Sequence, residues 1–244
     1  MWEIYDALLD GLPEGPRVTL TEQGMIWTLA KTDTGGTGIA MTTRGESVAA
    51  MYPGGLRGLP LRQAAEAVKS WHYYEASAGM AVINAWYNST ARLEALHAEE
   101  PRKDAVADGI DVRGREVGVV GHLSLPTDML AGAEKVYVLE RDPRPGDYPD
   151  PACEYLLPRC SLVIMSGSTF INKTLPRLLR LAAHAEVVVI GPTVPMAPAL
   201  LAYGIRRLSG LVLTDTDGIR AHVNTPGKGN PYRFGKTFLL EAAR

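Results

Sequence analysis

The stretch that decides the fold is Ser161–Pro198, which reads SLVIMSGSTFINKTLPRLLRLAAHAEVVVIGPTVPMAP. It contains two short apolar runs, Leu162–Met165 and Val187–Ile190, and each run stops in a loop of glycine, proline and small polar residues. Short aliphatic runs that alternate with helical patterns are typical of parallel strands whose two faces are both covered. Because ligands of such sheets bind outside the carboxyl ends of the strands, these loops mark the predicted site.

The composition is that of an ordinary soluble globular protein, with 244 residues of which 46% are hydrophobic and 21% are charged. A formal net charge of −2 gives no electrostatic reason to expect nucleic acid or an anionic membrane as a partner. No apolar run approaches the roughly 18 residues of a spanning helix and no signal peptide is visible, so we expect a cytoplasmic protein. In that setting Cys153 and Cys160 are predicted to be ordinary thiols.

Residues 1–104 predict a small α+β domain, in which an antiparallel meander is followed by helices. The expected strands are Arg17–Thr21, Met25–Lys31 and Gly38–Thr42. The expected helices are Trp2–Leu9, Leu61–Lys69, a third that is capped by Ser70 and runs to Asn88, and Ala91–Ala98. The charged segment Pro101–Asp104 interrupts the pattern and sets the expected boundary.

Residues 105–244 predict a Rossmann-like α/β domain with a doubly wound, mostly parallel sheet. Its strands follow one another at roughly 20–27 residues, which is the spacing of β-α-β units. They are Glu116–Val120, Lys135–Leu139, Leu162–Met165, Val187–Ile190 and Leu208–Leu213.

The first two strand ends point to a nucleoside rather than a dinucleotide. Gly121 and His122 follow the first strand, but the chain lacks the G-x-G-x-x-G pattern there, which argues against NAD. Glu140 ends the second strand about 20 residues after Gly121, where an acidic residue commonly accepts hydrogen bonds from ribose hydroxyls. S-adenosylmethionine is therefore favoured over NAD as a cofactor. Alternatively, Glu140 is a surface residue paired with Arg141 or Arg144.

The next two strand ends carry small polar residues and prolines. The first of these loops offers hydroxyls and an amide that suit a carboxylate or phosphate at a helix start, although helix capping would also explain them. The second of these loops is made rigid by its prolines. It is predicted to form either the wall of a preformed pocket or only a rigid connection to the next helix. The predicted cofactor contacts in them are Ser166, Gly167, Ser168, Thr169, Asn172, Gly191, Pro192 and Thr193.

The expected helix before Asn88 adds candidates from the first domain. Glu75 lies among small and apolar residues, where an ionised carboxylate is costly unless a cation or hydrogen-bond donors satisfy it. We predict catalytic roles for Glu75 and His122, with Tyr74 and Asn84 as substrate contacts. A salt-bridged Glu75 and a structural, hydrogen-bonded His122 are the alternatives.

Sequence motifs for metal binding and nucleophilic catalysis are absent. The five histidines are His72, His97, His122, His184 and His222, and no two of them are spaced as paired ligands. Neither cysteine belongs to a C-x-x-C pair, so no metal site is predicted. The chain also lacks a G-x-S-x-G elbow and a phosphate-binding G-x-x-x-x-G-K-[ST] loop.

Five segments together carry a family resemblance: SWHYYEASAGMAVINAWYN, VGVVGH, VYVLERDPRPGDYPD, IMSGSTFINKTL and GPTVPMAP. With them the chain resembles the bacterial and archaeal family labelled putative heavy-metal chelation proteins. The resemblance implies an N-terminal domain like that of enolase, a Rossmann-like C-terminal domain and a ligand site between them. It places Glu75 and Asn84 opposite His122, Glu140, Ser166–Thr169, Asn172 and the Gly191–Pro195 loop.

Three functions remain open from the sequence. The first is an enzyme of metal-chelator or specialised amino-acid metabolism that binds a small polar or anionic metabolite, with S-adenosylmethionine as the first cofactor to test. The second is a non-catalytic binder of a heavy metal or metal chelate. The third is an interaction module, which would not explain polar residues at four strand ends. We expect a small-molecule partner, and the sequence leaves oligomerisation open.

Overall fold

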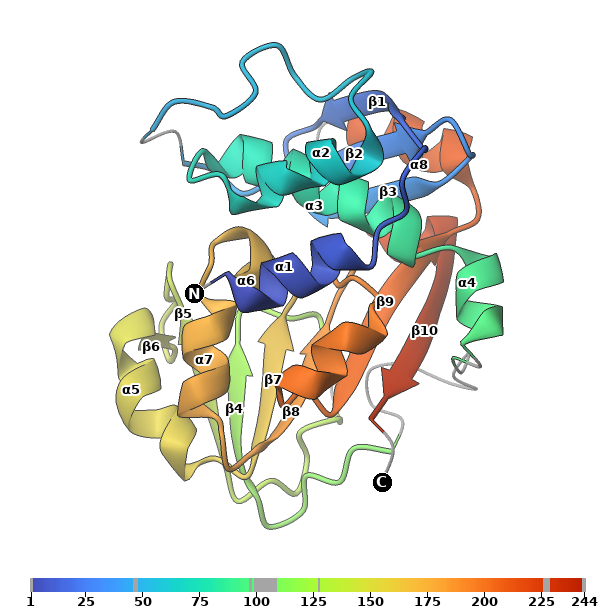
Figure 1. Cartoon of the computed structure of the whole chain (residues 1–244). Helices are drawn as coiled ribbons and strands as arrows, with labels where there is room; N and C mark the ends of the chain where they lie inside the picture. Colours follow the sequence, from blue (N-terminus) through green and yellow to red (C-terminus); the bar gives the residue numbers. More distant parts are fainter. Residues whose placement is uncertain are drawn as a thin grey trace.

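The computed structural model describes residues 2–45, 48–96, 98, 109–126, 128–225 and 229–242. Figure 1 shows a small three-stranded sheet with its helices lying above a larger, seven-stranded sheet. The domain boundary expected near residue 104 and the histidine at position 97 lie outside the described residues. No helix in the described part of the chain is both long enough and apolar enough to cross a membrane.

The N-terminal part forms the predicted antiparallel meander, β1-β2-β3, with α3 packed across one face of it. The close approach depends on Gly38, since a Cβ at this position would collide with backbone atoms of Ala81 and Ala85 in α3. The elements are α1 (Glu3–Asp10), β1 (Val18–Gln23), β2 (Trp27–Thr32), β3 (Thr37–Met41), α2 (Leu61–Ala65), η1 (Glu66–Lys69), α3 (Tyr73–Tyr87) and α4 (Thr90–Ala95).

The cap predicted for α3 is wrong by two residues. His72, not Ser70, precedes the helix, and its Nδ1 accepts a hydrogen bond from the backbone N–H of Glu75. Ser70 instead accepts a hydrogen bond from the N–H of His72, so it fixes the turn that leads to the cap.

The C-terminal part confirms the predicted α/β fold with a mostly parallel sheet, in the order β10-β9-β8-β7-β4-β5-β6. The strands are β4 (Glu116–Val120), β5 (Lys135–Glu140), β6 (Tyr148–Pro149), β7 (Leu162–Ser166), β8 (Glu186–Ile190), β9 (Arg207–Leu213) and β10 (Gly235–Glu241). The sequence did not predict β6 or β10, and β10 pairs antiparallel with β9 at the edge. The chain reverses its direction of winding between β4 and β7, where such sheets characteristically bind ligands.

Helices cover one face of this sheet, whereas the other is covered by loops and, beside β9, by α8. Val163 and Met165 point to a core shared with α7, whereas Leu162 and Ile164 point to a separate cluster. Residues of the β4–β5 connection cover the second face, and the described part of this connection contains no helix. The remaining elements are η2 (Asp150–Ala152), α5 (Cys153–Leu156), η3 (Leu157–Arg159), α6 (Ser168–Ile171), α7 (Leu175–Leu181), η4 (Pro198–Tyr203), α8 (Thr216–Val223) and η5 (Pro231–Phe234).

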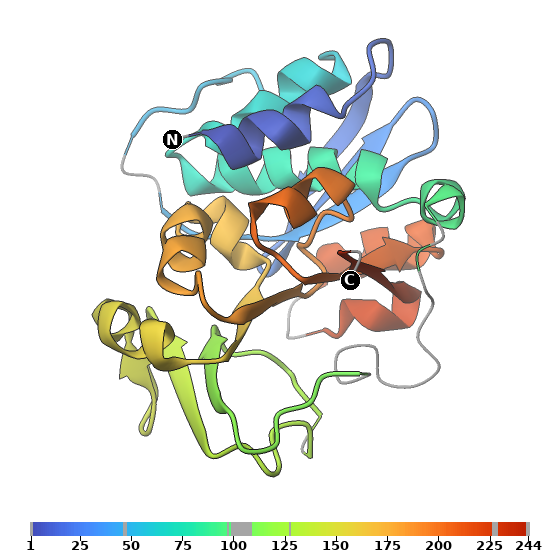
Figure 2. The ribbon, with the colours of Figure 1, turned by 60° about the horizontal axis from the view of Figure 1, so that its bottom comes forward.

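The two sheets are joined through α8, which packs against β2 (Figures 1 and 2). Ile219 and Val223 of α8 share a core cluster with Trp27 and Leu29 of β2. The alternate residues of β2 and β3, Ala30 and Ala40, belong to the core cluster on the side of α3. The three-stranded sheet therefore lies between α3 and α8. The two cysteines are both buried and free, as predicted.

Candidate functional site

Three adjoining cavities open at the carboxyl ends of β4, β5, β7 and β8, and we call them together the carboxyl-end cleft. Their volumes are about 680, 400 and 350 Å³. Met41, at the end of β3, lines all three, so the N-terminal part supplies one wall. The cleft brings together eleven of the predicted site residues: Gly121, His122, Glu140, Ser166, Gly167, Ser168, Thr169, Asn172, Gly191, Pro192 and Thr193.

The side chains of His122 and Asp147 form a hydrogen-bonded pair in the cleft. Nε2 of His122 lies 2.6 Å from Oδ2 of Asp147, and the two side chains are 26% and 12% exposed. The backbone N–H of Arg144 and the His122 ring both hold the pKa of Asp147 below its usual range. The ring is thus held in place by an ionised carboxylate while its other nitrogen stays available.

Asp147 was not predicted as a site residue. Its only sequence signal is that it is acidic and lies in the proline- and glycine-rich loop after β5.

Glu140 holds two loops together at the strand ends. Its Oε1 accepts a hydrogen bond from the backbone N–H of His122 at 3.3 Å, and its Oε2 accepts one from the N–H of Arg141 at 3.0 Å. The surface ion pairs considered for Glu140, with Arg141 or Arg144, are not formed within the described residues. The carboxylate therefore lines the cleft with both oxygens already engaged by the backbone.

The polar segment after β7 is partly helical, which corrects the predicted loop. Residues 168–171 form the single turn α6, and the hydroxyls of the segment mostly satisfy one another. Oγ of Ser168 lies 3.0 Å from Oγ of Ser166, and the Thr169 hydroxyl donates to the Ser166 carbonyl at 2.7 Å. Oδ1 of Asn172 accepts from the N–H and hydroxyl of Thr174. These polar groups are thus engaged within the segment, but no side chain caps α6 or α7, so helix capping does not account for them. The residues still line the cleft.

Asn84 of α3 and Asn88, the residue that directly follows α3, hold the loop after β8 in place. Nδ2 of Asn84 donates to the carbonyls of Ile39 and Thr193, at 2.8 and 3.0 Å, and its Oδ1 is buried without a hydrogen-bond partner among the described residues. Nδ2 of Asn88 donates to the Val194 carbonyl at 2.8 Å. The hydroxyl of Thr193 in turn accepts from the N–H of Met41. Asn84 thus does not line the cleft but supports the loop that does. Asn88 supports the same loop and was not predicted from the sequence.

The structure does not bring Glu75 or Tyr74 to the cavities of the cleft. Glu75 is 8% exposed, and its two oxygens accept hydrogen bonds from the N–H groups of Met51 and Tyr52, at 2.7 and 2.6 Å. Backbone donors therefore satisfy the carboxylate and fix the loop before α2. The catalytic role of Glu75 and the substrate contact of Tyr74 stay predictions without a place among the cleft residues.

The donor set of the cleft does not fit a resident metal ion. Within the described ranges, no three or more His, Cys, Asp or Glu side chains are grouped so that they could share a metal. Closed zinc sites use four ligands and catalytic ones three protein ligands. His122, backed by Asp147, can supply one.

Comparisons with known proteins agree on one family. The sequence profile of the DUF364 family, described as "putative heavy-metal chelation", matches residues 107–236. A second profile, DUF4213, has the same description and matches residues 5–87. An uncharacterised protein of Methanocaldococcus jannaschii is 31% identical over 156 residues, which cover 61% of this chain and 58% of that protein. The aligned region thus spans less than two thirds of that relative.

Two solved structures share the whole fold. A DUF364-family protein with unknown function from Desulfitobacterium hafniense is 35% identical, with a TM-score of 0.88 over 99% of this chain and 98% of that one. Another from Pyrococcus horikoshii is 20% identical, with a TM-score of 0.79 over 98% of both chains, a likeness of fold alone. The profile match and the 35% identical structure together show that the chain belongs to the DUF364 family, the heavy-metal chelation family that its motifs resemble.

Proposed function

We propose that the carboxyl-end cleft binds a metal chelate, that is, a small organic anion that carries a metal ion. The observation that carries this proposal is the pair formed by His122 and Asp147. Nε2 of His122 is bound to the carboxylate, and Nδ1 has no hydrogen-bond partner in the described part of the chain. A carboxylate that holds one imidazole nitrogen fixes the tautomer that presents the other nitrogen to a metal.

A single imidazole favours a chelated metal over a bare ion. A bare ion needs three or four donors to be held tightly, and the described residues do not gather such a set. An organic chelator brings most of the donors itself. One histidine can then fill a position that the chelator leaves open, and this agrees with the description of the family.

The charges around the cleft suit the acidic groups of a chelator. Three exposed arginines line it, namely Arg44, Arg141 and Arg144, and none of them forms an ion pair with a described residue. Four carboxylates line the cleft as well. Asp147 is engaged with His122 and a backbone N–H, Glu140 with backbone N–H groups, and Asp150 with Arg177, which leaves Asp142 as the one without an ion pair or side-chain hydrogen bond among the described residues. Guanidinium groups that are not committed to protein carboxylates are suited to bind the carboxylates of a ligand in a bidentate manner.

Isothermal titration of untagged protein with Ni(II)–nitrilotriacetate, free Ni(II) and free nitrilotriacetate tests the proposal. We expect one chelate per chain and much weaker binding of free Ni(II). Asp147→Asn should weaken chelate binding by about 10- to 100-fold, the usual effect of losing the carboxylate behind a histidine ligand. His122→Ala should weaken it at least as much. His184→Ala is the matched control, because His184 is exposed in the turn between α7 and β8.

Three outcomes would overturn the proposal. One is tight binding of free Ni(II) to the wild-type protein, which would indicate a resident metal site. Another is equal chelate binding by the wild-type protein and His122→Ala. The third is a complete lack of chelate binding.

The second candidate is a nucleoside cofactor, S-adenosylmethionine before NAD, in an enzyme of chelator or amino-acid metabolism. It is favoured by Glu140, which ends β5 and lines the cavity of about 350 Å³ beside Gly121. The backbone hydrogen bonds of both Glu140 oxygens weaken this candidate. Titration with S-adenosylmethionine decides it: binding that Glu140→Gln weakens would support it, and absence of binding would exclude this cofactor.

A further inference from the structure

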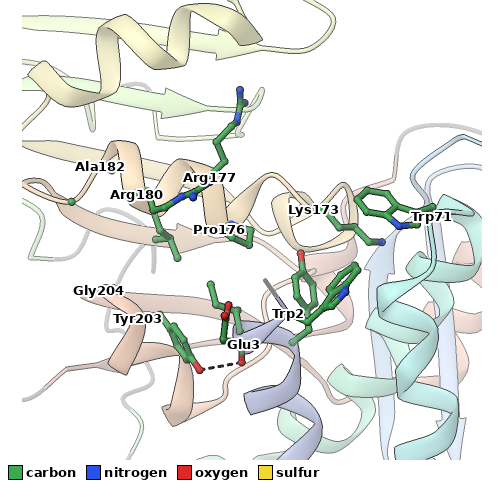
Figure 3. Close-up of a pocket in the computed structure, with 14 residues that line it drawn as sticks. Trp2, Glu3, Trp71, Lys173, Pro176, Arg177, Arg180, Ala182, Tyr203 and Gly204 are labelled. Carbon is green, nitrogen blue, oxygen red and sulfur yellow. Dashed lines mark hydrogen bonds between the residues drawn. The ribbon is translucent and has the colours of Figure 1, made fainter.

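A separate cavity of about 820 Å³ lies between α1 and α7, and it shares no lining residue with the carboxyl-end cleft (Figure 3). Its walls come from four places in the sequence: the start of α1, the turn before α3, the segment from Lys173 to Ala183, and Tyr203 and Gly204 at the end of η4. Its volume falls within the range of about 300–1,000 Å³ that is typical of small-molecule sites. Nothing in the proposed function uses this cavity.

One end of the cavity is built from aromatic rings. The ring centroids of Trp2 and Trp71 are 5.9 Å apart with a tilt of 57°, and Tyr5 meets Trp2 edge-on at 5.2 Å. Trp71 is 52% exposed, although tryptophan is usually well buried. A planar apolar ligand that stacked here would cover this exposed ring.

Lys173 brings an amine to the same end, and Figure 3 shows its side chain extending toward Trp71. Nζ donates to the Ile171 carbonyl at 2.7 Å and lies 5.9 Å from the centre of the Trp71 ring. It forms no ion pair in the part of the chain that the structure describes. Burial lowers the pKa of Lys173 to about 7, against the opposing effect of the Glu75 charge. A desolvated amine that forms no ion pair is stabilised by an anion that enters beside it.

The charged side chains that line the cavity besides Lys173 are Glu3, Arg177 and Arg180. Arg177 is engaged by Asp150 at 2.7 Å and by Glu154 at 3.0 Å, and Figure 3 shows it turned away from the tryptophans. Arg180 is exposed and forms no ion pair with a described residue. The titratable groups that face Lys173 or line the cavity with it are Glu3, Tyr5, Tyr73, Glu75, Arg177, Arg180 and Tyr203.

We propose that this cavity is a second ligand site, which binds a planar aromatic carboxylate. The ring of the ligand packs against Trp2 and Trp71, and its carboxylate pairs with Lys173. A monoanion matches this chemistry because the aromatic end of the cavity offers one ammonium group. Arg180 lies on the same helix as the cavity wall and adds to the positive field.

Paired probes of equal shape test the site. 2-Naphthoate and 2-naphthamide differ in charge but hardly in size, and their binding can be followed by isothermal titration and by quenching of tryptophan fluorescence. The wild-type protein should bind 2-naphthoate at least 10-fold more tightly than 2-naphthamide. Lys173→Met should abolish that preference, whereas Trp71→Leu should weaken both probes. Lys135→Met is the matched control, since this exposed lysine lies on β5, away from the cavity.

The proposal is overturned if the wild-type protein binds neither probe or binds both equally. It is also overturned if Lys173→Met keeps the full preference for 2-naphthoate. Circular dichroism of each variant confirms that it is folded, and Trp71→Leu keeps the site testable should Lys173→Met fail to fold.

Discussion

Replacing Lys173 with methionine should stabilise the protein at neutral pH. Methionine is of similar length and removes the amine whose pKa burial lowers from 10.5 to about 7. At 1.36 kcal/mol for each pKa unit, this difference corresponds to about 5 kcal/mol. The side chain is only partly buried and water screens its charge, so we expect about 2–3 kcal/mol.

The sign follows from where the proton is bound. Between about pH 7 and 10.5 the unfolded chain keeps a proton on this amine that the folded protein has lost. The buried charge of Lys173 lowers the free energy of unfolding of the wild-type protein, and this loss disappears as pH rises through this window. Below about pH 7 both states are protonated and the cost is fully present. The difference in the free energy of unfolding between Lys173→Met and the wild-type protein should be largest at pH 6.5. It should decrease by about 2–3 kcal/mol by pH 10.5.

Urea unfolding of both proteins at half-unit steps from pH 6.5 to 10.5 measures this change. The difference between the two curves isolates Lys173, because the other titrating groups contribute equally to both. Loss of the hydrogen bond to the Ile171 carbonyl shifts the whole difference by a constant of about 1 kcal/mol and does not change its slope. Lys135→Met is the control for removing an exposed lysine. A difference that stays flat across the window would refute the argument.

Two further predictions concern packing and the thiols. Gly38→Ala should lower the free energy of unfolding by more than about 2 kcal/mol, because a Cβ at this position meets the backbone of α3. Gly54→Ala is the control: it adds a methyl group in open space and should change the free energy of unfolding by less than about 0.5 kcal/mol. Urea titration measures both variants. At pH 8 Cys153 and Cys160 should react with Ellman's reagent only after denaturation, because burial raises their pKa values to about 12 and about 11. Rapid reaction of either thiol in native buffer would contradict the structure.

The strands of the large sheet could be predicted because their signal is local. Leu162–Met165 and Val187–Ile190 are aliphatic runs that end in turn residues, and both lie inside observed strands. The position of the cleft followed from topology, since parallel strands place their carboxyl ends at one edge. By contrast, β10 and β6 depend on partners that no local pattern identifies: β10 is an edge strand, and β6 has two residues.

Side-chain roles were harder to predict because they depend on distant backbone. The family resemblance implies that Glu75 lies across the site from His122, and in the structure the Glu75 carboxylate accepts hydrogen bonds from N–H groups 23 and 24 residues earlier in the chain. Glu140 was predicted to bind ribose hydroxyls, but its two oxygens accept hydrogen bonds from backbone N–H groups of two loops. No pattern in the sequence indicated Lys173 as a site residue, because the aromatic ring beside it belongs to Trp71, about a hundred residues earlier in the chain.

Hydrogen bonds from the C-terminal end of α3 and from Asn88, which follows it, fix one wall of the cleft. Asn84 and Asn88 donate to the carbonyls of Thr193 and Val194, and the N–H of Met196 donates back to Oδ1 of Asn88. These bonds are buried, and breaking one without replacement costs about 1–3 kcal/mol for each polar group that is left unpaired. Moving the N-terminal part away from the loop after β8 would break all three together. The N-terminal part therefore acts as a fixed wall of the carboxyl-end cleft rather than a hinged lid, and the chelate that we propose would enter a pocket whose shape is already set.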